Sequence, residues 1–382
     1  MTSHMPFGSV CALQNGRAFK PSEWTETGTP IVRIQNLNDE TKPFNYCEFE
    51  VESRFHIDTG DLLFSWSGTP GTSFGAFFWN RGKAFLNQHI FRVDVDESVT
   101  DKDYLRHAIN SKLNLIIDQA HGGVGLKHIT KGKLEAIEIF HPPLAEQKRI
   151  ATVLDKADAI RRKRQQAIKL TDQFLRAVFL DMFGDPVTNP KEWNRVTLGD
   201  LIHFAKDGPH VSPKYSEDGI PFLSTRHIRP TGVIWEDLKY ITQEEAKIHW
   251  KKCKPQFGDI VYTKGGTTGI ACQVDFDKDF AIWVHVALLR PIVEKVNFIW
   301  LTHMLNSQYC YLQSQKYTRG ATNKDLGLTR MVHIEMFCPP LPEQEKFVDI
   351  RKKVVNLLEK DNAFLNECLF ESLSKNAFAG KL

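Results

Sequence analysis

The chain has 382 residues, of which 42% are hydrophobic and 25% charged, as in ordinary globular proteins of two or three domains. Its net charge at pH 7 is only +3, which excludes a basic field over the whole molecule. Any site for nucleic acid must therefore come from local clusters of basic side chains.

Cysteine usage and hydropathy indicate the compartment. The seven cysteines are scattered and form no Cys-x-x-Cys pair, which favours reduced thiols in an intracellular protein. No apolar run approaches the roughly 20 residues that cross a bilayer. No signal peptide opens the chain. We expect a cytoplasmic protein that does not bind membranes.

The first domain, expected at residues 6–141, mixes short β-prone runs with turn residues. Gly60-Asp-Leu-Leu-Phe-Ser-Trp66 and Phe74-Gly-Ala-Phe-Phe-Trp79 are typical of strands bounded by Gly, Pro, Asn and Ser. The stretch from Tyr104 to Ala120 favours a helix. The sequence predicts a strand-rich domain with a few helices.

The next segment, residues 142–185, is predicted to be one long helix. Pro142-Pro143 ends the preceding domain and suits the start of a helix. From Leu144 to Phe183 there is no Gly or Pro, and apolar residues recur at spacings of three and four. Gly184-Asp-Pro186 predicts its end. Such a helix is roughly 60 Å long.

After a linker at residues 186–196, the chain repeats itself. His141-Pro-Pro-Leu-Ala-Glu-Gln147 returns as Cys338-Pro-Pro-Leu-Pro-Glu-Gln344, and the segment at 60–71 returns at 258–269. A repeat of this length indicates a duplicated domain. A second strand-rich domain is therefore expected at residues 197–338, with a helix from Phe298 to Lys316, and a second long helix at residues 339–382.

These elements predict an α+β fold. Two pseudo-symmetric strand-rich globular domains are separated by two long antiparallel helices. A single amphipathic helix of this length needs a partner, and each copy offers one to the other as a coiled coil.

The sequence carries no recognisable catalytic motif. Gly265-Gly-Thr-Thr-Gly269 lacks the lysine of a phosphate-binding loop, and no His or Cys cluster has the spacing of a metal site. Each Pro-Pro pair is followed by leucine, unlike the Asn/Asp-Pro-Pro-Tyr/Phe of amino-methyltransferases. His89 and His285 occupy matching positions, for which a shared packing role is favoured over chemistry. We predict no catalytic residue and no metal.

Two sites differ between the copies. One follows matching strands, with Arg33, Gln35 and Asn36 in the first copy and Ser224 to His227 in the second. The other follows the repeated Gly-Asp segment, where Ser65-Trp66-Ser67 stands against Thr263-Lys264-Gly265. The aspartates of that segment, Asp61 and Asp259, are predicted to form turns. Divergent side chains on a repeated frame favour two readers of different targets, although ordinary surface residues also vary.

The residues at several places resemble a known family. Pro142 to Ala151, continued by Leu154 to Lys163, is similar to the central region of type I restriction-modification specificity subunits. Ala18 to Trp24 and Ile31 to Leu37 resemble the start of their target-recognition domains, and Lys375 to Leu382 resembles their C-terminal end. The resemblance covers essentially the whole chain and includes its duplicated plan.

The resemblance implies a non-catalytic subunit that binds double-stranded DNA. Each domain would be a target-recognition domain that reads one half of an asymmetric bipartite site, and the helices would fix the gap between the halves. Two adenine-methyltransferase subunits would dock around the helices, and restriction (motor-nuclease) subunits would join them. The chain itself would need no cofactor, because S-adenosylmethionine, ATP and Mg would belong to these partners.

Contact residues follow from this function and from side-chain chemistry. Arginine pairs with guanine, and Asn or Gln pairs with adenine, in the major groove, while lysine contacts phosphate. The predicted base contacts are Arg33, Gln35, Asn36, Ser65, Trp66, Thr225, Arg226 and His227. The predicted phosphate contacts are Lys20, Lys127, Lys264 and Lys324.

The basic run on the first long helix is open to three interpretations. It is a solvated helix face, a contact to the DNA backbone, or a docking surface for a partner, to which we assign Arg161, Arg162, Lys163 and Arg164.

Two other classes of function remain open at this stage. One is a structural coiled-coil adaptor whose domains bind proteins. The other is a self-sufficient DNA restriction or methylation enzyme.

Overall fold

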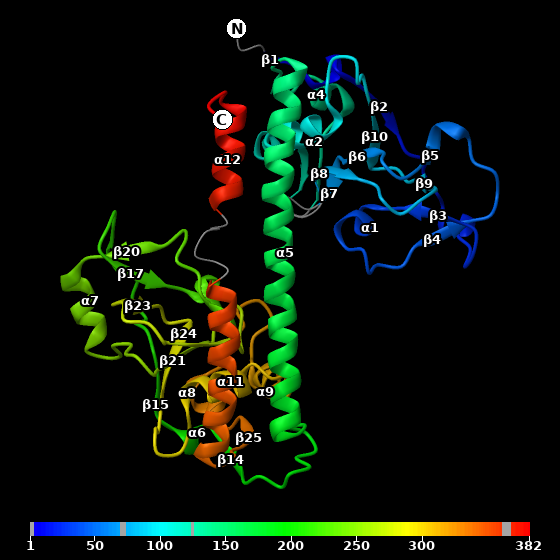
Figure 1. Ribbon diagram of the computed structural model, residues 1–382. Helices are drawn as coiled ribbons and strands as arrows, with labels where there is room; N and C mark the ends of the chain where they lie inside the picture. The colour runs from blue at the N-terminus through cyan, green and yellow to red at the C-terminus, as the bar shows by residue number, and fades with distance from the viewer. Residues whose placement is uncertain (1–3, 69–73, 124–125, 361–367) are drawn as a thin grey trace. The chain divides into compact units, whose positions relative to one another are not determined.

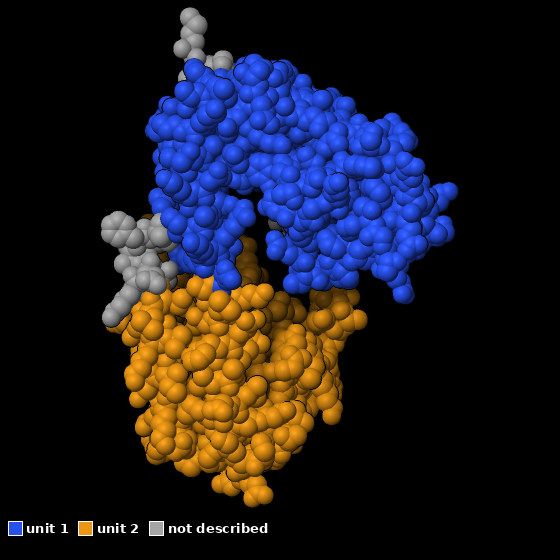
Figure 2. All heavy atoms as spheres, turned by 45° about the vertical axis from the view of Figure 1, so that its right-hand side comes forward, with its two compact units in different colours: residues 1–166, 362–382 blue, residues 167–361 orange. Residues whose placement is uncertain are grey.

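The computed structural model describes residues 4–68, 74–123, 126–360 and 368–382 (Figure 1). The chain divides into two compact units, one of residues 1–166 with 362–382 and the other of residues 167–361 (Figure 2). Helix α5, Leu144–Phe183, contributes its first part to one unit and its last part to the other. Each unit therefore combines a strand-rich domain with part of this helix.

The first unit is built on two four-stranded sheets. One is antiparallel, in the order β2 (Cys11–Asn15), β10 (Ile90–Val95), β6 (Leu62–Ser65) and β8 (Gly75–Phe78). The other has the order β4 (Asn45–Cys47), β3 (Thr29–Val32), β9 (Ala84–Leu86) and β5 (His56–Ile57), and pairs β3 with β9 in parallel.

Smaller pairings and short helices complete the first unit. Strand β1 (His4–Pro6) pairs with β13 (Glu138–Phe140), and β12 (Leu126–His128) lies between β11 (His121–Gly123) and β7 (Ser67–Gly68). The helices are α1 (Ile34–Asn38), α2 (Lys102–Asn110), α3 (Leu113–Gln119) and α4 (Lys131–Glu135).

The second unit repeats this plan. Its antiparallel sheet has the order β15 (Ile202–Asp207), β24 (Val286–Pro291), β21 (Ile260–Thr263) and β22 (Ala271–Gln273). Its mixed sheet has the order β16 (Tyr215–Ser216), β20 (Lys239–Ile241), β17 (Ile220–Leu223) and β23 (Ala281–Ile282), again with one parallel pair, β17 with β23.

The remaining elements of the second unit match the first unit in part. Strand β14 (Arg195–Thr197) pairs with β25 (Glu335–Phe337), as β1 pairs with β13. Strands β18 (Ile228–Arg229) and β19 (Gly232–Val233) form a short hairpin. The helices are α6 (Leu198–Leu201), α7 (Gln243–Trp250), α8 (Phe298–Leu305), α9 (Gln308–Tyr317) and α10 (Leu328–Met331).

Each predicted domain helix is divided in two. In the first unit, α2 ends before Ser111 and α3 begins at Leu113, and in the second, α8 ends before Asn306 and α9 begins at Gln308. The side chain of Ser307 accepts a hydrogen bond from the amide of Cys310, so it caps the start of α9. Apolar periodicity predicted the helical stretch, but a capping residue inside it begins a new helix.

Helix α5 has the length that the sequence predicts. It runs for 40 residues, and Gly184, with φ of +83°, follows it in the left-handed conformation that ends helices. The C-terminal helix is described as α11 (Leu341–Lys360) and α12 (Cys368–Phe378).

In each unit, part of α5 pairs antiparallel with one of these C-terminal helices. In the first unit, Ala377 of α12 is buried in one core with Ile150 and Leu154, and Arg149 donates a hydrogen bond of 2.8 Å to the carbonyl of Leu382 (Figure 1). The end of the chain thus lies beside the start of α5. In the second unit, the ring of Phe347, near the start of α11, lies 5.3 Å from the ring of Phe179, near the end of α5. The predicted α+β fold, with repeated domains and antiparallel long helices, is confirmed.

Each domain shares its largest core with its helix. Ile150, Ala151 and Leu154 of α5 are buried with residues of the first domain's antiparallel sheet and of α2. Phe179 and Phe183 are buried with residues of the second domain's sheet and of α8. This packing removes apolar surface of both the domain and the helix from water. Each domain and its part of α5 therefore form one packed body.

Asparagines at matching places tie a domain helix to the edge of the antiparallel sheet. Asn110 accepts a hydrogen bond of 2.8 Å from the amide of Ala76 and donates one of 3.0 Å to its carbonyl. Asn306 does the same with Ala271, at 3.0 and 2.9 Å. Strands β8 and β22 are the edges of their sheets, so these side chains satisfy backbone groups that would otherwise be open.

The burial of α5 in the second core predicts a stability difference between two phenylalanines of one helix. Phe183 is 0% exposed and Phe174 is 49% exposed. Phe183→Ala should lower the free energy of unfolding by about 3–5 kcal/mol, because it removes buried ring contacts and leaves a cavity. Phe174→Ala should change it by about 0.5 kcal/mol or less. Chemical denaturation followed by circular dichroism measures both, and equal losses would contradict this packing.

Candidate DNA interface

The first divergent site begins where strand β3 ends. Arg33 is the residue before helix α1, so Gln35 and Asn36 lie in a helical turn and not on a continuing strand. The guanidinium of Arg33 lies 5.2 Å from the centre of the Trp24 ring and donates a hydrogen bond of 3.2 Å to Asn45 Oδ1. Arg33 is half-buried and Gln35 is exposed.

Asn36 has a structural role in this turn. It is 0% exposed, its Oδ1 accepts a hydrogen bond of 3.0 Å from the amide of Arg33, and its Nδ2 donates to the carbonyls of Lys42 and Pro43 at 3.1 and 3.2 Å. The expectation that Asn36 presents its amide to DNA does not fit this placement. The side chain instead holds the loop that follows α1.

The equivalent turn of the second domain presents Arg226. Thr225 to His227 form a 3-10 helix directly after strand β17 and Ser224. Arg226 is exposed, its guanidinium donates a hydrogen bond of 2.7 Å to the carbonyl of Asp237, and its Nε lies 3.2 Å from Nε2 of His227.

His227 takes the place of Asn36 in this turn. It is 3% exposed, and its Nδ1 accepts a hydrogen bond of 3.0 Å from the amide of Ser224. Burial is the main cause that lowers the pKa of His227. Because its side chain is buried, as that of Asn36 is, the expected base contact from His227 does not fit this placement either.

A small pocket lies beside Arg226. Its volume is about 200 Å³, and it is bounded by Tyr215, Phe222, Ser224, Arg226, His227, Lys239 and Trp283. The ammonium of Lys239 lies 4.2 Å from the centre of the Tyr215 ring, and the rings of Phe222 and Trp283 lie 6.4 Å apart. Aromatic faces with a guanidinium and an ammonium at their rim can receive an electron-rich planar group.

Sequence reasoning missed the pocket residues Tyr215, Lys239 and Trp283. They come from three strand regions that meet only through the pairing of β16, β20, β17 and β23. The repeat itself could have pointed to one of these positions, because the two copies share their backbone bonds. Trp283 donates its amide to Leu223 at 2.9 Å, as Asn87 donates to Val32 at 3.1 Å, so Trp283 and Asn87 are equivalent positions with unlike side chains.

At the second divergent site, after the Gly-Asp segment, Ser65 and Lys264 are buried and Trp66 is half-buried. Ser65 is 0% exposed, and Trp66 donates from Nε1 to Asn15 Oδ1 at 3.2 Å while its ring stacks on Phe91 at 5.6 Å. The side chain of Lys264 is 8% exposed and lies 3.4 Å from Asp207 and 3.1 Å from Asp325. The expected DNA contacts from Ser65 and Lys264 do not fit these placements, whereas the contact predicted for the half-buried Trp66 stays a prediction.

The two copies fill this site with different chemistry. Asn15 and Asp207 each end the first strand of their antiparallel sheet, so a neutral Trp66–Asn15 pair in one copy replaces the Lys264–Asp207 ion pair of the other. Burial acts to raise the pKa of Asp207, but the hydrogen bond from Lys252 and the charges of Lys252, Lys264 and His210 outweigh it and lower the pKa. Asp207 is thus held as a buried carboxylate.

The matched histidines support the same loops through their backbone. The carbonyl of His89 accepts a hydrogen bond of 3.1 Å from the amide of Trp66, and that of His285 accepts one of 2.9 Å from Lys264. Since these bonds use only backbone atoms, the packing role predicted for the two side chains stays a prediction.

The matched aspartates form turns, also as predicted. Asp61 accepts a hydrogen bond of 2.8 Å from the amide of Asp58, and Asp259 accepts one of 2.9 Å from Gln256.

The remaining lysines assigned to phosphate differ in accessibility. Lys20 and Lys324 are exposed, whereas Lys127 is half-buried and donates a hydrogen bond of 3.2 Å to the carbonyl of Ile117. Residues 124–125 of the Gly-rich turn before Lys127 lie outside the described residues. Lys20 and Lys324 are the lysines of this set best placed to meet a phosphate.

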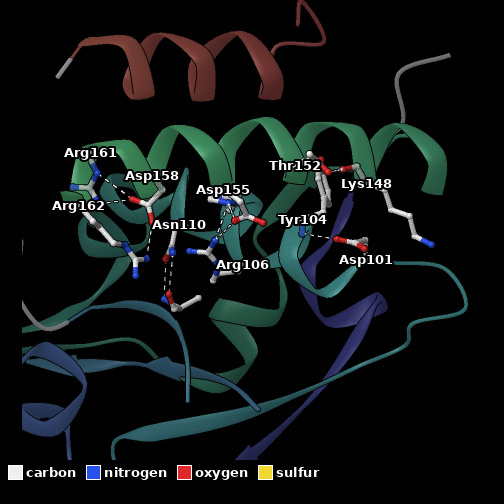
Figure 3. A network of polar contacts seen from close by, with 12 residues as sticks. Asp101, Tyr104, Arg106, Asn110, Lys148, Thr152, Asp155, Asp158, Arg161 and Arg162 are labelled. Carbon is white, nitrogen blue, oxygen red and sulfur yellow. Dashed lines mark hydrogen bonds and ion pairs between the residues drawn. The ribbon is translucent and has the colours of Figure 1, made fainter. Parts of the chain in front are cut away.

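The basic run of α5 is partly neutralised within the chain. Arg161 and Arg162 form ion pairs of 2.7 and 2.6 Å with Asp158, one turn earlier on the helix (Figure 3). Burial acts to raise the pKa of Asp158, but these two arginines outweigh it and lower the pKa. Lys163 is exposed, and Arg164 is half-buried with an interaction of its own.

Among the described residues, no group of three or more His, Cys, Asp or Glu side chains is arranged to hold a metal ion. In the same ranges, no helix is both long and apolar enough to cross a membrane.

Comparison with known proteins identifies the family. Residues 4–170 and 190–367 match the family described as type I restriction modification DNA specificity domain. The chain is 25% identical to the type I restriction enzyme EcoBI specificity subunit of Escherichia coli, over 98% of this chain and 85% of that protein. It is 22% identical to the MjaVIII specificity subunit of Methanocaldococcus jannaschii, over 79% of this chain and 74% of that protein.

A solved structure shares the fold. The type I restriction-modification S subunit from M. genitalium superposes with a TM-score of 0.62 and 14% identity, over 99% of this chain and 96% of that one. With two family matches that together span most of the sequence, the chain belongs to the type I restriction-modification DNA specificity subunits, the non-catalytic DNA-recognition members of these systems.

Proposed function

We propose that the two domains of this DNA-recognition subunit read the two unlike halves of one asymmetric site. One observation carries this proposal: the same backbone position bears different chemistry in each domain. Strands β3 and β17 each pair in parallel with a later strand, and the residues that follow them differ. Arg33 and Asn87 stand in the first domain where Ser224 and Trp283 stand in the second.

The first reading surface consists of Arg33 and Gln35, with Trp24 and Asn87 behind them. The guanidinium of Arg33 is stacked near the Trp24 ring and oriented by Asn45, which leaves its remaining N–H groups for a base edge. The guanidinium of Arg33 and the exposed amide of Gln35 suit guanine and adenine edges in the major groove.

The second reading surface consists of Thr225 and Arg226 with the aromatic pocket. Arg226 is exposed while Asp237 and His227 orient it, so one ordered cation faces outward beside the rings of Tyr215 and Trp283. Cations and aromatic faces are both common in DNA-binding surfaces. Lys20, Lys127 and Lys324 supply phosphate contacts, whereas Lys264 serves the interior.

The long helices set the gap between the two half-sites and carry the partner subunits. Leu170, Phe174 and Leu180 of α5 are 56%, 49% and 50% exposed, more than a helix of one chain ordinarily leaves in water. Near them, a hollow of about 630 Å³ is lined by α5, α8 and α9, with Leu180, Tyr309 and Leu312 among its residues. These apolar surfaces, together with the basic run at 161–164, suit docking of adenine-methyltransferase subunits, which restriction subunits then join.

Chemistry in such a complex resides in the partners. The methyltransferase subunits bind S-adenosylmethionine and extrude the target adenine from the duplex, and the restriction subunits use ATP and Mg. This chain holds the flanking sequence while they act.

Substitution of Arg226 tests whether each domain reads its own half-site. Arg226→Ala should cost about 1–3 kcal/mol of discrimination at one position of the second half-site and leave the first half-site unchanged, because the guanidinium contacts one base edge. The measurement is competition binding with duplexes that carry single base changes, with the subunit in complex with its methyltransferase. Arg33→Ala is the matched control, expected to act on the first half-site alone. Equal weakening of both half-sites by Arg226→Ala would show that its role is not base reading.

Two lysines of the second domain provide a paired test of phosphate contact. Lys324→Ala should reduce the slope of log affinity against log salt by about 1, without loss of stability, because it removes one exposed phosphate contact. Lys264→Ala should lower the free energy of unfolding by about 2–3 kcal/mol, because it leaves the buried Asp207 with fewer partners. Salt titration of binding and chemical denaturation separate the two effects. The assignment fails if Lys264→Ala changes the salt slope while leaving stability intact.

A further inference from the structure

The repeated Pro-Pro-Leu-x-Glu-Gln segment has no role in the DNA contacts proposed above. Its glutamines, Gln147 and Gln344, are both 0% exposed, so neither touches DNA or a partner from this position. Buried polar side chains remain in protein interiors when they satisfy specific hydrogen bonds. What these two side chains bind therefore indicates what the repeated segment does.

Gln147 lies in the first turns of α5 and reaches back to the first domain. Its Oε1 accepts a hydrogen bond of 2.9 Å from the amide of Asp101, the capping residue of α2. Its Nε2 donates to the carbonyl of Val99 at 3.2 Å and to that of Pro142 at 2.8 Å. One amide thus joins the domain, the double proline and the helix.

Gln344 makes the same set of bonds in the second unit. Its Oε1 accepts a hydrogen bond of 2.8 Å from the amide of Asn297, the capping residue of α8. Its Nε2 donates to the carbonyl of Lys295 at 3.3 Å and to that of Pro339 at 2.7 Å. We call this contact between domain and helix, made by one glutamine side chain, the joint. The same joint occurs in both units, although the residues around it differ.

The chemistry of the joint requires a glutamine. One end must accept from a backbone amide while the other donates to two carbonyls, and a neutral primary amide does both. Glutamate has nearly the same size, but an ionised carboxylate would face two carbonyl oxygens without a proton to donate. In a site that excludes water, that arrangement leaves polar groups unpaired and loosens the joint.

The joint lies where a small rotation has a large effect on DNA register. A domain of about 100 residues has a radius of gyration near 13 Å. A rotation of about 15° about the joint would move a point about 13 Å away by about 3.4 Å, one base-pair step along a strand. The apolar core shared with α5 holds the domain on the helix, but hydrogen bonds fix direction more strictly than apolar contact does.

We propose that Gln147 and Gln344 are positioning residues that fix the angle of each recognition domain on its helix. The complex thereby accepts one gap length between half-sites and rejects gaps one base pair longer or shorter. The inference rests on the proposed bipartite function and deepens it. It assigns the rigidity of the gap to two buried amides that contact no DNA.

The test measures binding to duplexes whose half-sites are cognate and whose gap is the preferred length or one base pair longer or shorter. The protein is the subunit in complex with its methyltransferase. Gln147→Glu should weaken binding at the preferred gap by about tenfold, which corresponds to the loss of one or two buried hydrogen bonds. Binding at the neighbouring gaps should fall much less, so discrimination between gaps shrinks, while base preferences within each half-site stay the same.

Asn110→Asp is the matched control. It also turns an amide that binds one backbone amide and one carbonyl into a carboxylate, but this side chain is half-buried and its partner, Ala76, belongs to the same domain. This control should lower stability and leave discrimination between gaps unchanged. Gln344→Glu and Asn306→Asp repeat the comparison in the second unit. If the Gln147→Glu complex does not fold, Gln147→Met, neutral and similar in length, replaces it.

The outcomes separate this inference from the proposed function. If both glutamine variants lower binding at all gaps by one common factor, as the asparagine controls would, the glutamines are only structural and the inference is overturned. If the unsubstituted complex binds with no preference for gap length, the bipartite function itself fails. Loss of gap discrimination confined to the glutamine variants supports both.

Discussion

The shared core between each strand-rich domain and the helix beside it is the constraint on which the rest of the structure depends. Leu154 in one unit and Phe183 in the other are completely buried among domain residues, so neither domain can leave its helix without exposing apolar surface. A buried glutamine adds direction to each of these contacts. Recognition surfaces built on such a body are presented at a defined place relative to the helix.

The two domains share one backbone arrangement but differ in many side chains. The order of the antiparallel sheet, the parallel pair of the mixed sheet, the asparagine at the sheet edge and the glutamine at the helix all recur. The residues after β3 and β17 differ, and so does the pair formed after the Gly-Asp segment, which is Trp66 with Asn15 in one copy and Lys264 with Asp207 in the other. A frame that tolerates such exchange can acquire new base preferences in one domain without affecting the other.

Much of the fold was predictable from the sequence, and less of the site. The bounds of α5 followed from the absence of Gly and Pro between Leu144 and Phe183 and from Gly184, because these determine where a helix can continue. Burial of single side chains was not predictable: Asn36 and His227 were expected to contact bases, whereas a helical turn directs both inward. Tyr215, Lys239 and Trp283 were missed because strand pairing, a non-local feature, brings them together.

The most direct test of two different readers in one chain is selection of bound sequences from a random DNA pool by the subunit in complex with its methyltransferase. The account predicts one gapped motif with two unlike halves and a single gap length, bound with a steep dependence on salt. A continuous motif, two identical halves, or no enrichment by a complex shown to be intact would contradict it. The last result would favour an adaptor that binds proteins.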